Sequence, residues 1–313
     1  MTRLNMRKDP SMLLRIISIL TATITLTACT TSSTGSAPAG AAPAQFATPE
    51  AAVAALKGVL QNPNPKVAEA LFGPRWSELR QSPDEAPQAR AAFLTRLQQG
   101  HQIDRVGDGA ILVVGRADDP DRFAFTVPLC QHDGRWSWDT AAGIEEFRLR
   151  RLGRNELDTI DTMKAIAAAQ RAFFDSSAQG GAATVFATRI KSSAGRTDGL
   201  YWPTTGSQPP SFVGAALAGA DRTMVDAKGT APFNGYWFAV LPPSASGPLG
   251  TVIAWPDQYG VSGIMTFLVS ADGIVYERDL GGDTSKAREL CSDSASSETR
   301  TTGWTRTDSP SQK

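Results

Sequence analysis

The chain has 313 residues, which is enough for two domains of ordinary size. Hydrophobic residues make up 41% and charged residues 20%, values that are typical of a globular protein and exclude a wholly disordered one. Basic and acidic side chains balance at 31 each, so charge gives no reason to expect a nucleic-acid partner. With three cysteines and two histidines, we expect neither a disulfide scaffold nor a metal site, and no cofactor.

The first 28 residues have the pattern of a secretory signal peptide. A basic start precedes an apolar stretch over residues 16–28, which is shorter than the roughly 20 residues of a bilayer span. The stretch ends in Leu26-Thr27-Ala28-Cys29, which resembles the bacterial lipobox. The resemblance implies cleavage before Cys29, a thioether-linked lipid on its sulfur and acylation, for example by palmitate, of the new N-terminus. The alternatives are an ordinary signal peptide with a chance cysteine and a short uncleaved anchor.

Thr30 rather than aspartate follows the cysteine. By the sorting rule of enteric bacteria, this resembles a lipoprotein of the outer membrane that faces the periplasm. Residues 29–45 consist almost entirely of Ser, Thr, Gly, Ala and Pro, which cannot bury enough surface to offset their conformational entropy. We therefore expect a flexible tether between the lipid and a folded body.

Residues 46–150 predict helices followed by a meander of strands. Thr48-Pro49-Glu50 and Asn64-Pro65 are helix starts, and Phe93, Leu94 and Leu97 suggest a third helix. Strands are expected at 110–115 and 123–129, and Asp133-Gly134 predicts a hairpin turn. The order of elements is similar to the cystatin-like or nuclear-transport-factor-2-like cone, which implies an α+β domain but no activity.

Residues 151–290 predict a second α+β domain, and 291–313 a disordered tail. Apolar residues recur every three or four positions over residues 155–174, and four strands are expected at 236–241, 251–255, 264–270 and 274–278. We therefore predict two domains of the same class, each with helix packed on an antiparallel sheet. The second is similar to the head domain of type IV pilins and pseudopilins, although a charged segment and not an apolar polymerisation segment precedes its helix.

Six segments of residues 153–281 occur in an order that resembles the DUF2950 family of bacterial secreted proteins and lipoproteins. They are Gly153-Arg154-Asn155-Glu156, Asp198 to Pro203, Gly235 to Phe238, Ala254 to Gly263, Met265-Thr266-Phe267, and Gly273 to Gly281. The resemblance covers about residues 46–282. The family has no established activity, so the likeness implies no mechanism.

No catalytic motif is present, so we predict no catalytic residue. His132 beside Asp133 is interpreted as part of a solvated turn, and His101 as the cap of a helix end. The charged segment around Glu145 and Glu156 is interpreted as an ion-paired connector between the domains. The alternatives are an anion-binding arginine cluster and acid–base catalysis by the two glutamates.

Aromatic residues crowd the second half, and several lie beside Pro or Gly. Most are expected in the core, but four in predicted loops could line a shallow groove for a glycan or a peptide: Tyr201, Trp202, Trp255 and Tyr259. After lipidation Cys130 and Cys291 remain, and the sequence leaves open whether they pair.

The pattern as a whole predicts a cell-envelope lipoprotein that acts as a non-catalytic binding or scaffold module. Its expected partners are the membrane, through Cys29, and an envelope glycan or protein. The alternative is an envelope-tethered enzyme that uses the acidic residues at the domain junction.

Overall fold

The computed structural model describes residues 42–79, 86–179, 185–204, 208–223, 231–242, 250–283, 285–292 and 303–308. The predicted signal peptide, Cys29 and most of the tether lie outside them. The chain divides into two compact units, Met1–Arg148 and Leu149–Lys313, two residues from the predicted boundary. Each unit combines helices with an antiparallel sheet, so the predicted α+β class is confirmed. In the described part of the chain, no helix has both the length and the apolar character that a bilayer crossing needs.

Local capping chemistry starts the first two helices of unit 1. The Thr48 hydroxyl accepts a hydrogen bond from the Ala51 N–H at 3.2 Å, and the Asn64 side chain accepts one from Lys66 at 2.9 Å. Proline occupies the first turn of both helices, where its missing N–H costs nothing. Both predicted helix starts are therefore confirmed. The helical elements of this unit are α2 (Pro49–Gln61), α3 (Pro65–Phe72), η2 (Trp76–Leu79) and α4 (Ala86–Gln99).

The sheet of unit 1 has the strand order β1-β2-β4-β5, with the short β3 also paired to β2. The predicted hairpin is confirmed, because Asp133 and Gly134 both have positive φ, at 49° and 74°. The single strand expected over 123–129 is wrong: Pro128, which has no N–H for a ladder, separates β3 from β4. The strands are β1 (His101–Val106), β2 (Gly109–Val114), β3 (Phe123–Ala124), β4 (Leu129–His132) and β5 (Arg135–Trp138).

The core of unit 1 lies between the three α-helices and one face of the sheet. Ala110, Leu112 and Val114 alternate along β2, so they share one face, and all three are fully buried. They pack in one cluster with helix residues such as Leu56 and Leu97. Sheet and helices are thus held by a single apolar cluster.

One helix, α5 (Thr140–Gln179), runs for 40 residues from unit 1 into unit 2. Asp139 caps its start by accepting the Ala142 N–H at 3.0 Å. The expected helix at 155–174 is only its C-terminal part, and the charged segment before it is helical as well. Glu145 and Arg148 support this segment as an i,i+3 ion pair at 2.6 Å.

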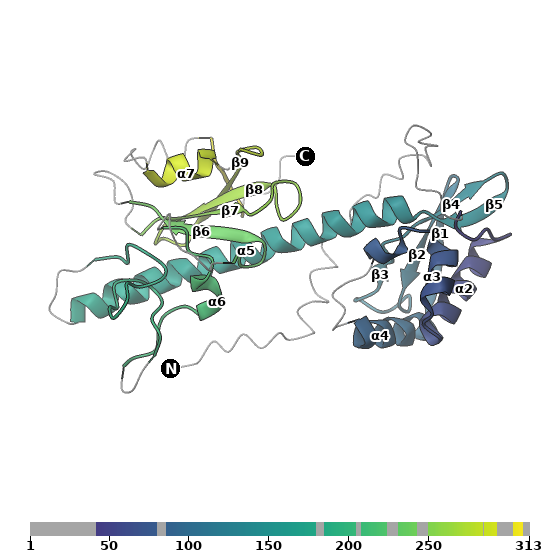
Figure 1. Ribbon diagram of the computed structural model, residues 1–313, viewed down its shortest axis with the longest axis horizontal. Coiled ribbons are helices and arrows are strands. Elements are labelled where there is room, and N and C mark those ends of the chain that lie inside the picture. Colours follow the sequence, from purple (N-terminus) through teal and green to yellow (C-terminus); the bar gives the residue numbers. More distant parts are fainter. Residues whose placement is uncertain are drawn as a thin grey trace. The chain divides into compact units, whose positions relative to one another are not determined.

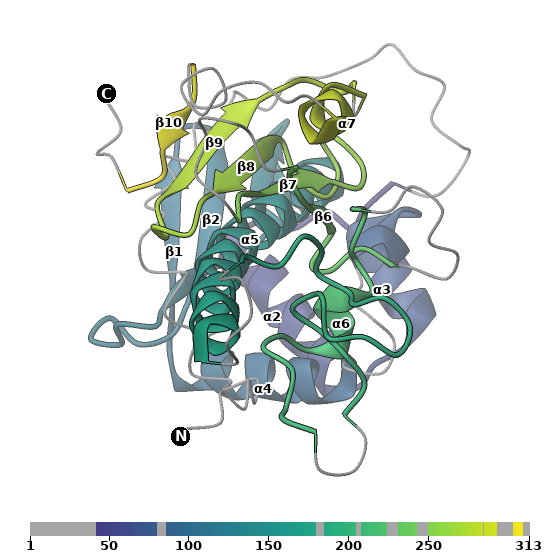
Figure 2. The same ribbon diagram turned by 90° about the vertical axis from the view of Figure 1, so that its left-hand side faces the viewer.

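Unit 2 packs helices on both faces of its sheet, whose strand order is β10-β9-β8-β7-β6. Figures 1 and 2 show α5 on one face and α7 on the other. All residues of β6 and β7 are buried, as expected for strands covered on both sides. The four predicted strands are confirmed. The remaining elements are α6 (Ala215–Ala218), β6 (Tyr236–Val240), β7 (Val252–Pro256), β8 (Met265–Val269), β9 (Val275–Asp279), α7 (Ser285–Ser292) and β10 (Thr305–Arg306).

Two segments expected to be flexible contain ordered residues. In the tail, β10 pairs with β9, and the Thr307 N–H donates to the Val275 carbonyl at 3.0 Å. At the end of the tether, the Ala44 N–H donates to the Ala70 carbonyl at 2.9 Å, and the next segment begins with Phe46, which forms a bridge with Trp136. Backbone pairing to an existing element orders both segments, although neither carries an apolar pattern of its own.

Candidate functional site

Segments that resemble the family pattern meet where α5 crosses the entry to β8. The Asn155 side-chain amide donates to the Ser262 carbonyl at 2.8 Å. One carboxylate oxygen of Glu156 accepts the N–H groups of Ile264 at 2.8 Å and Met265 at 3.0 Å. We call Asn155 and Glu156 the Asn-Glu clamp. The clamp bonds the helix to the loop that starts β8, over more than 100 positions of sequence.

Glycines let the chain approach the clamp closely. Gly235 has φ +78°, and a Cβ at this position would lie 2.9 Å from the Asn155 amide nitrogen. A Cβ on Gly263 would lie 2.5 Å from Cζ of Tyr236, whose hydroxyl donates to the Met265 carbonyl at 3.0 Å. The glycines at positions 235 and 263 therefore have a packing reason.

A second carboxylate near the clamp, that of Glu277 on β9, has a shifted pKa and also affects the pKa of Tyr236. Burial, and then the charge of Glu156, raise the pKa of Glu277 above its ordinary value. Burial, Glu156 and Glu277 together raise the pKa of the Tyr236 phenol, so it stays protonated. The phenol therefore acts as a hydrogen-bond donor, and Glu156 is occupied by backbone N–H groups.

The raised pKa of Glu277 predicts a pH-dependent cost in stability. Folding disfavours the charged form, so stability falls as pH rises from the ordinary pKa of glutamate, about 4.3, through the raised folded value. We expect Glu277→Gln to unfold at a higher temperature than the wild type at pH 7, with the difference vanishing near pH 4. Thermal melts at both pH values measure it. An equal difference at both would mean that charge is not the cause.

The four aromatic residues predicted to line a groove lie in different surroundings. Trp202 and Trp255 are buried, with 6% and 4% of their surface exposed, and the Trp202 ring N–H donates to the Pro209 carbonyl at 2.9 Å. Tyr201 is half-buried, whereas Tyr259 is 38% exposed and its hydroxyl donates to Asp279 at 3.1 Å. Only the two tyrosines present surface to a ligand, and the glycan or peptide groove stays a prediction.

The glutamates of the enzymatic alternative are both engaged within the protein. Glu145 forms a two-point ion pair with Arg148, at 2.6 and 2.9 Å, which lowers the pKa of its carboxyl. Glu156 holds two backbone N–H groups, as described above. Each carboxylate therefore has a structural partner.

The histidines and cysteines of the described chain lie in unit 1, apart from Cys291. His101 begins β1 and hydrogen-bonds the Leu97 carbonyl in the last turn of α4; burial and Lys57 nevertheless lower its pKa. His132 ends β4, before the hairpin turn. Cys130 is buried on β4 and is disulfide-bonded. The side chain of Cys291 lies outside the described part, so its pairing with Cys130 stays open.

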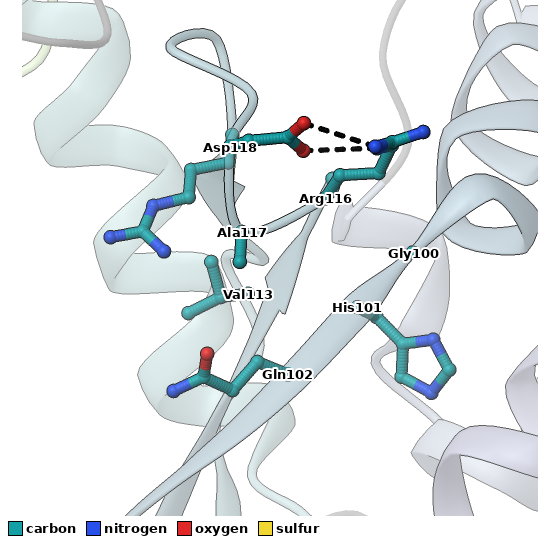
Figure 3. A pocket seen from close by; sticks show the side chains of 9 residues that line it. Gly100, His101, Gln102, Val113, Arg116, Ala117 and Asp118 are labelled. Atoms are coloured by element: carbon teal, nitrogen blue, oxygen red, sulfur yellow. Dashed lines mark hydrogen bonds and ion pairs between the residues drawn. The ribbon is translucent and has the colours of Figure 1, made fainter.

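Two pockets hollow the surface of unit 1. The first encloses about 340 Å³ where β1 begins, and Figure 3 shows Gln102, Val113 and Ala117 on one side of the strands and His101 on the other. Sequence reasoning missed this pocket, because β1 itself has no clear apolar alternation. The second encloses about 320 Å³ at the start of α5, and its lining includes Phe72, Arg75, Cys130, His132, Ser137 and Asp139.

No three histidine, cysteine or acidic side chains gather as metal ligands in the described part of the chain.

Comparison with known proteins identifies the family. Neither a curated protein nor a solved structure matches the chain. The model of one family matches residues 44–296, which include nearly all of the two folded units. The chain therefore belongs to DUF2950, a family described as proteins of unknown function.

Proposed function

We propose that the protein is a lipoprotein of the bacterial cell envelope that acts as a non-catalytic binding or scaffold module. A lipid on Cys29 anchors it to the outer membrane, facing the periplasm, and its partner is an envelope protein or glycan. The observation that carries the proposal is the Leu26-Thr27-Ala28-Cys29 sequence behind a basic and apolar start. Two or more acyl chains suffice for stable attachment to a membrane.

Features within each folded unit support a binding role. The carboxylates considered for catalysis, Glu145 and Glu156, are held by Arg148 and by backbone N–H groups. The surface hollows of unit 1 are open and lined by mixed polar and apolar residues, as is common for recognition sites. An apolar cluster fills each unit by itself, and such a packed interior can hold a recognition surface in place.

Replacement of Cys29 tests the proposal. We expect Cys29→Ser to appear in the soluble fraction, with no acyl mass on its N-terminal peptide, whereas the wild type stays with the membranes. As a matched control, Thr30→Asp should keep the acyl mass and change only the membrane in which the protein is found. Mass spectrometry and density-gradient fractionation measure both. An unmodified Cys29 thiol, an uncleaved leader or a Cys29–Cys130 disulfide in the wild type would contradict lipidation.

A further inference from the structure

The first strand of unit 1 has an open outer edge. β1 pairs with β2 over six residues, and no other described strand lies on its far side. Its two ends are exposed, and Val106 keeps 56% of its surface accessible. The main-chain groups of such an edge are free to pair with an added strand.

The phase of the ladder identifies which groups face outward. The Gly115 N–H donates to the Gly100 carbonyl at 2.9 Å, immediately before β1. Successive residues of a strand direct their N–H and C=O groups to opposite sides, so His101, Ile103 and Arg105 direct theirs to the open edge. In the described part of the chain, the main-chain N–H groups of these three residues have no acceptor. Three donors and three acceptors thus lie in a row.

Several usual protections of an edge strand are missing from β1, although it carries Asp104 and Arg105. Natural edges carry proline, lysine or a bulge, or are covered by another segment. β1 contains neither proline nor lysine, and its pairing with β2 is one to one without a bulge. The charge of Arg105 is directed to Glu50, at 3.0 Å, and its guanidinium lies over the Trp136 ring at 5.6 Å. The edge is therefore able to accept a partner strand.

The 340 Å³ pocket lies at the start of this edge. His101 and Gln102, the first two residues of β1, both line it. Figure 3 shows Gln102 and Val113 side by side on one face of the β1–β2 pair. In recognition by strand addition, main-chain bonds provide affinity and a pocket for a side chain provides specificity. Here the two features are adjacent.

The charges around the pocket favour an acidic side chain. Both oxygens of Asp118 are bound by Arg116, at 2.9 and 3.0 Å, as Figure 3 shows. Asp119 is neutralised by Arg96 at 2.8 Å. Arg122, which also lines the pocket, has no carboxylate partner within the described residues. A guanidinium without a partner is a ready site for a carboxylate.

We propose that β1 is a docking edge for an extended, acidic segment of another protein. The segment pairs with the outward main-chain groups of His101, Ile103 and Arg105, and it places a glutamate or aspartate in the pocket beside Arg122. The inference rests on the proposed function as a binding module, and it names the site and the chemistry of the partner.

A pair of synthetic peptides tests the proposal on the full chain in detergent micelles. The probe is a capped hexapeptide of sequence Thr-Val-Glu-Val-Thr-Val, and its control has Lys in place of Glu. We expect the glutamate peptide to bind at least tenfold more tightly by fluorescence anisotropy. It should also slow hydrogen exchange at the amides of His101, Ile103 and Arg105. No protection at these amides would overturn the proposal.

Charge reversal and edge blocking separate the two parts of the site. Arg122→Glu should reverse the preference in favour of the lysine peptide, whereas Lys66→Glu, an exposed change on α3, should leave it unaltered. His101→Pro removes an outward N–H from the first residue of an edge strand, where proline is tolerated. We expect it to stay folded, with its melting temperature lowered only by the loss of the His101 side-chain bond to the Leu97 carbonyl, and to weaken both peptides at least tenfold. Unchanged affinities in both site variants would contradict the assigned edge.

Other occupants of the edge give distinct results. Amides of β1 that are already protected in the free monomer would mean that another segment of this chain covers the edge. A concentration-dependent dimer that His101→Pro dissociates would mean that a second copy does. Either result overturns the proposal. If the peptides do not bind but Cys29 is lipidated, only the docking edge is refuted. If Cys29 is unmodified but the peptides bind, only the proposed lipid anchor is refuted.

Discussion

Asp221→Ala is expected to destabilise unit 2 by about 3–5 kcal/mol, because it removes the acceptor of three backbone N–H groups at once. Asp221 is 6% exposed. One carboxylate oxygen accepts the N–H groups of Ile190 at 3.0 Å and Lys191 at 2.7 Å, and the other accepts that of Thr223 at 2.8 Å. Alanine would leave the buried Ile190 donor and the partly buried Lys191 and Thr223 donors without partners, and each orphaned buried donor costs about 1–3 kcal/mol.

Thermal unfolding measures this loss. For a unit of this size, 1 kcal/mol shifts the melting temperature by about 2–4 °C, so we expect a fall of roughly 10 °C. Asp118→Ala is the matched control, because its carboxylate is exposed and bound only by Arg116. That variant should melt with the wild type. If Asp221→Ala also melted with the wild type, the carboxylate would not be what ties residues 190–191 to residue 223.

Local chemistry made several elements predictable. Thr48 and Asn64 cap helices with their own side chains, and Asp133-Gly134 adopts the positive φ values that its hairpin requires. β6, β7 and β8 were predictable because each contains at least four apolar residues, and β9 because it follows the turn signal Ala271-Asp272-Gly273. In each case the signal lies within a few residues of the element that it specifies.

Elements that carry no apolar pattern of their own were not predictable. β10 has no apolar pattern and is ordered by its pairing with β9, and β1 contains adjacent charged residues, Asp104 and Arg105. The charged first part of α5 was interpreted as a connector, because charged side chains give no apolar period. In fact glutamate, leucine and arginine all favour helix, and Glu145 and Arg148 pair along it.

For the candidate sites too, the sequence shows local patterns but does not show which residues the fold buries or brings together. The sequence places Trp202 and Trp255 beside prolines, which is a pattern typical of loops, but it does not report that their rings are buried. The Asn-Glu clamp was visible as part of a family-like segment, whereas its bonds to Ile264 and Met265 depend on how α5 lies on the sheet. The β1 edge has no neighbouring strand among the described residues, and a single sequence carries no signal for such an open edge.

Among glycine-to-alanine substitutions in the described part of unit 2, Gly263→Ala is expected to lower the stability most. The added Cβ would overlap the Tyr236 hydroxyl and lie 2.5 Å from its Cζ. Tyr236 is fully buried, and its hydroxyl bond to the Met265 carbonyl fixes the ring, so the ring cannot move aside without losing that bond. Overpacking of a buried site costs about 1–3 kcal/mol and sometimes more. We expect a loss on the order of 3 kcal/mol or more.

Gly153→Ala provides the matched control in the same unit. It adds the same methyl group in the middle of α5, where a Cβ would meet nothing within 4 Å. Removing a glycine from a helix interior stabilises by about 0.5–1 kcal/mol, so this variant should melt slightly above the wild type. Chemical denaturation of both variants measures the contrast. If Gly263→Ala and Gly153→Ala unfolded at the same denaturant concentration, the close approach of Tyr236 to the loop before β8 would be refuted, and with it the packing reason for glycine at this position.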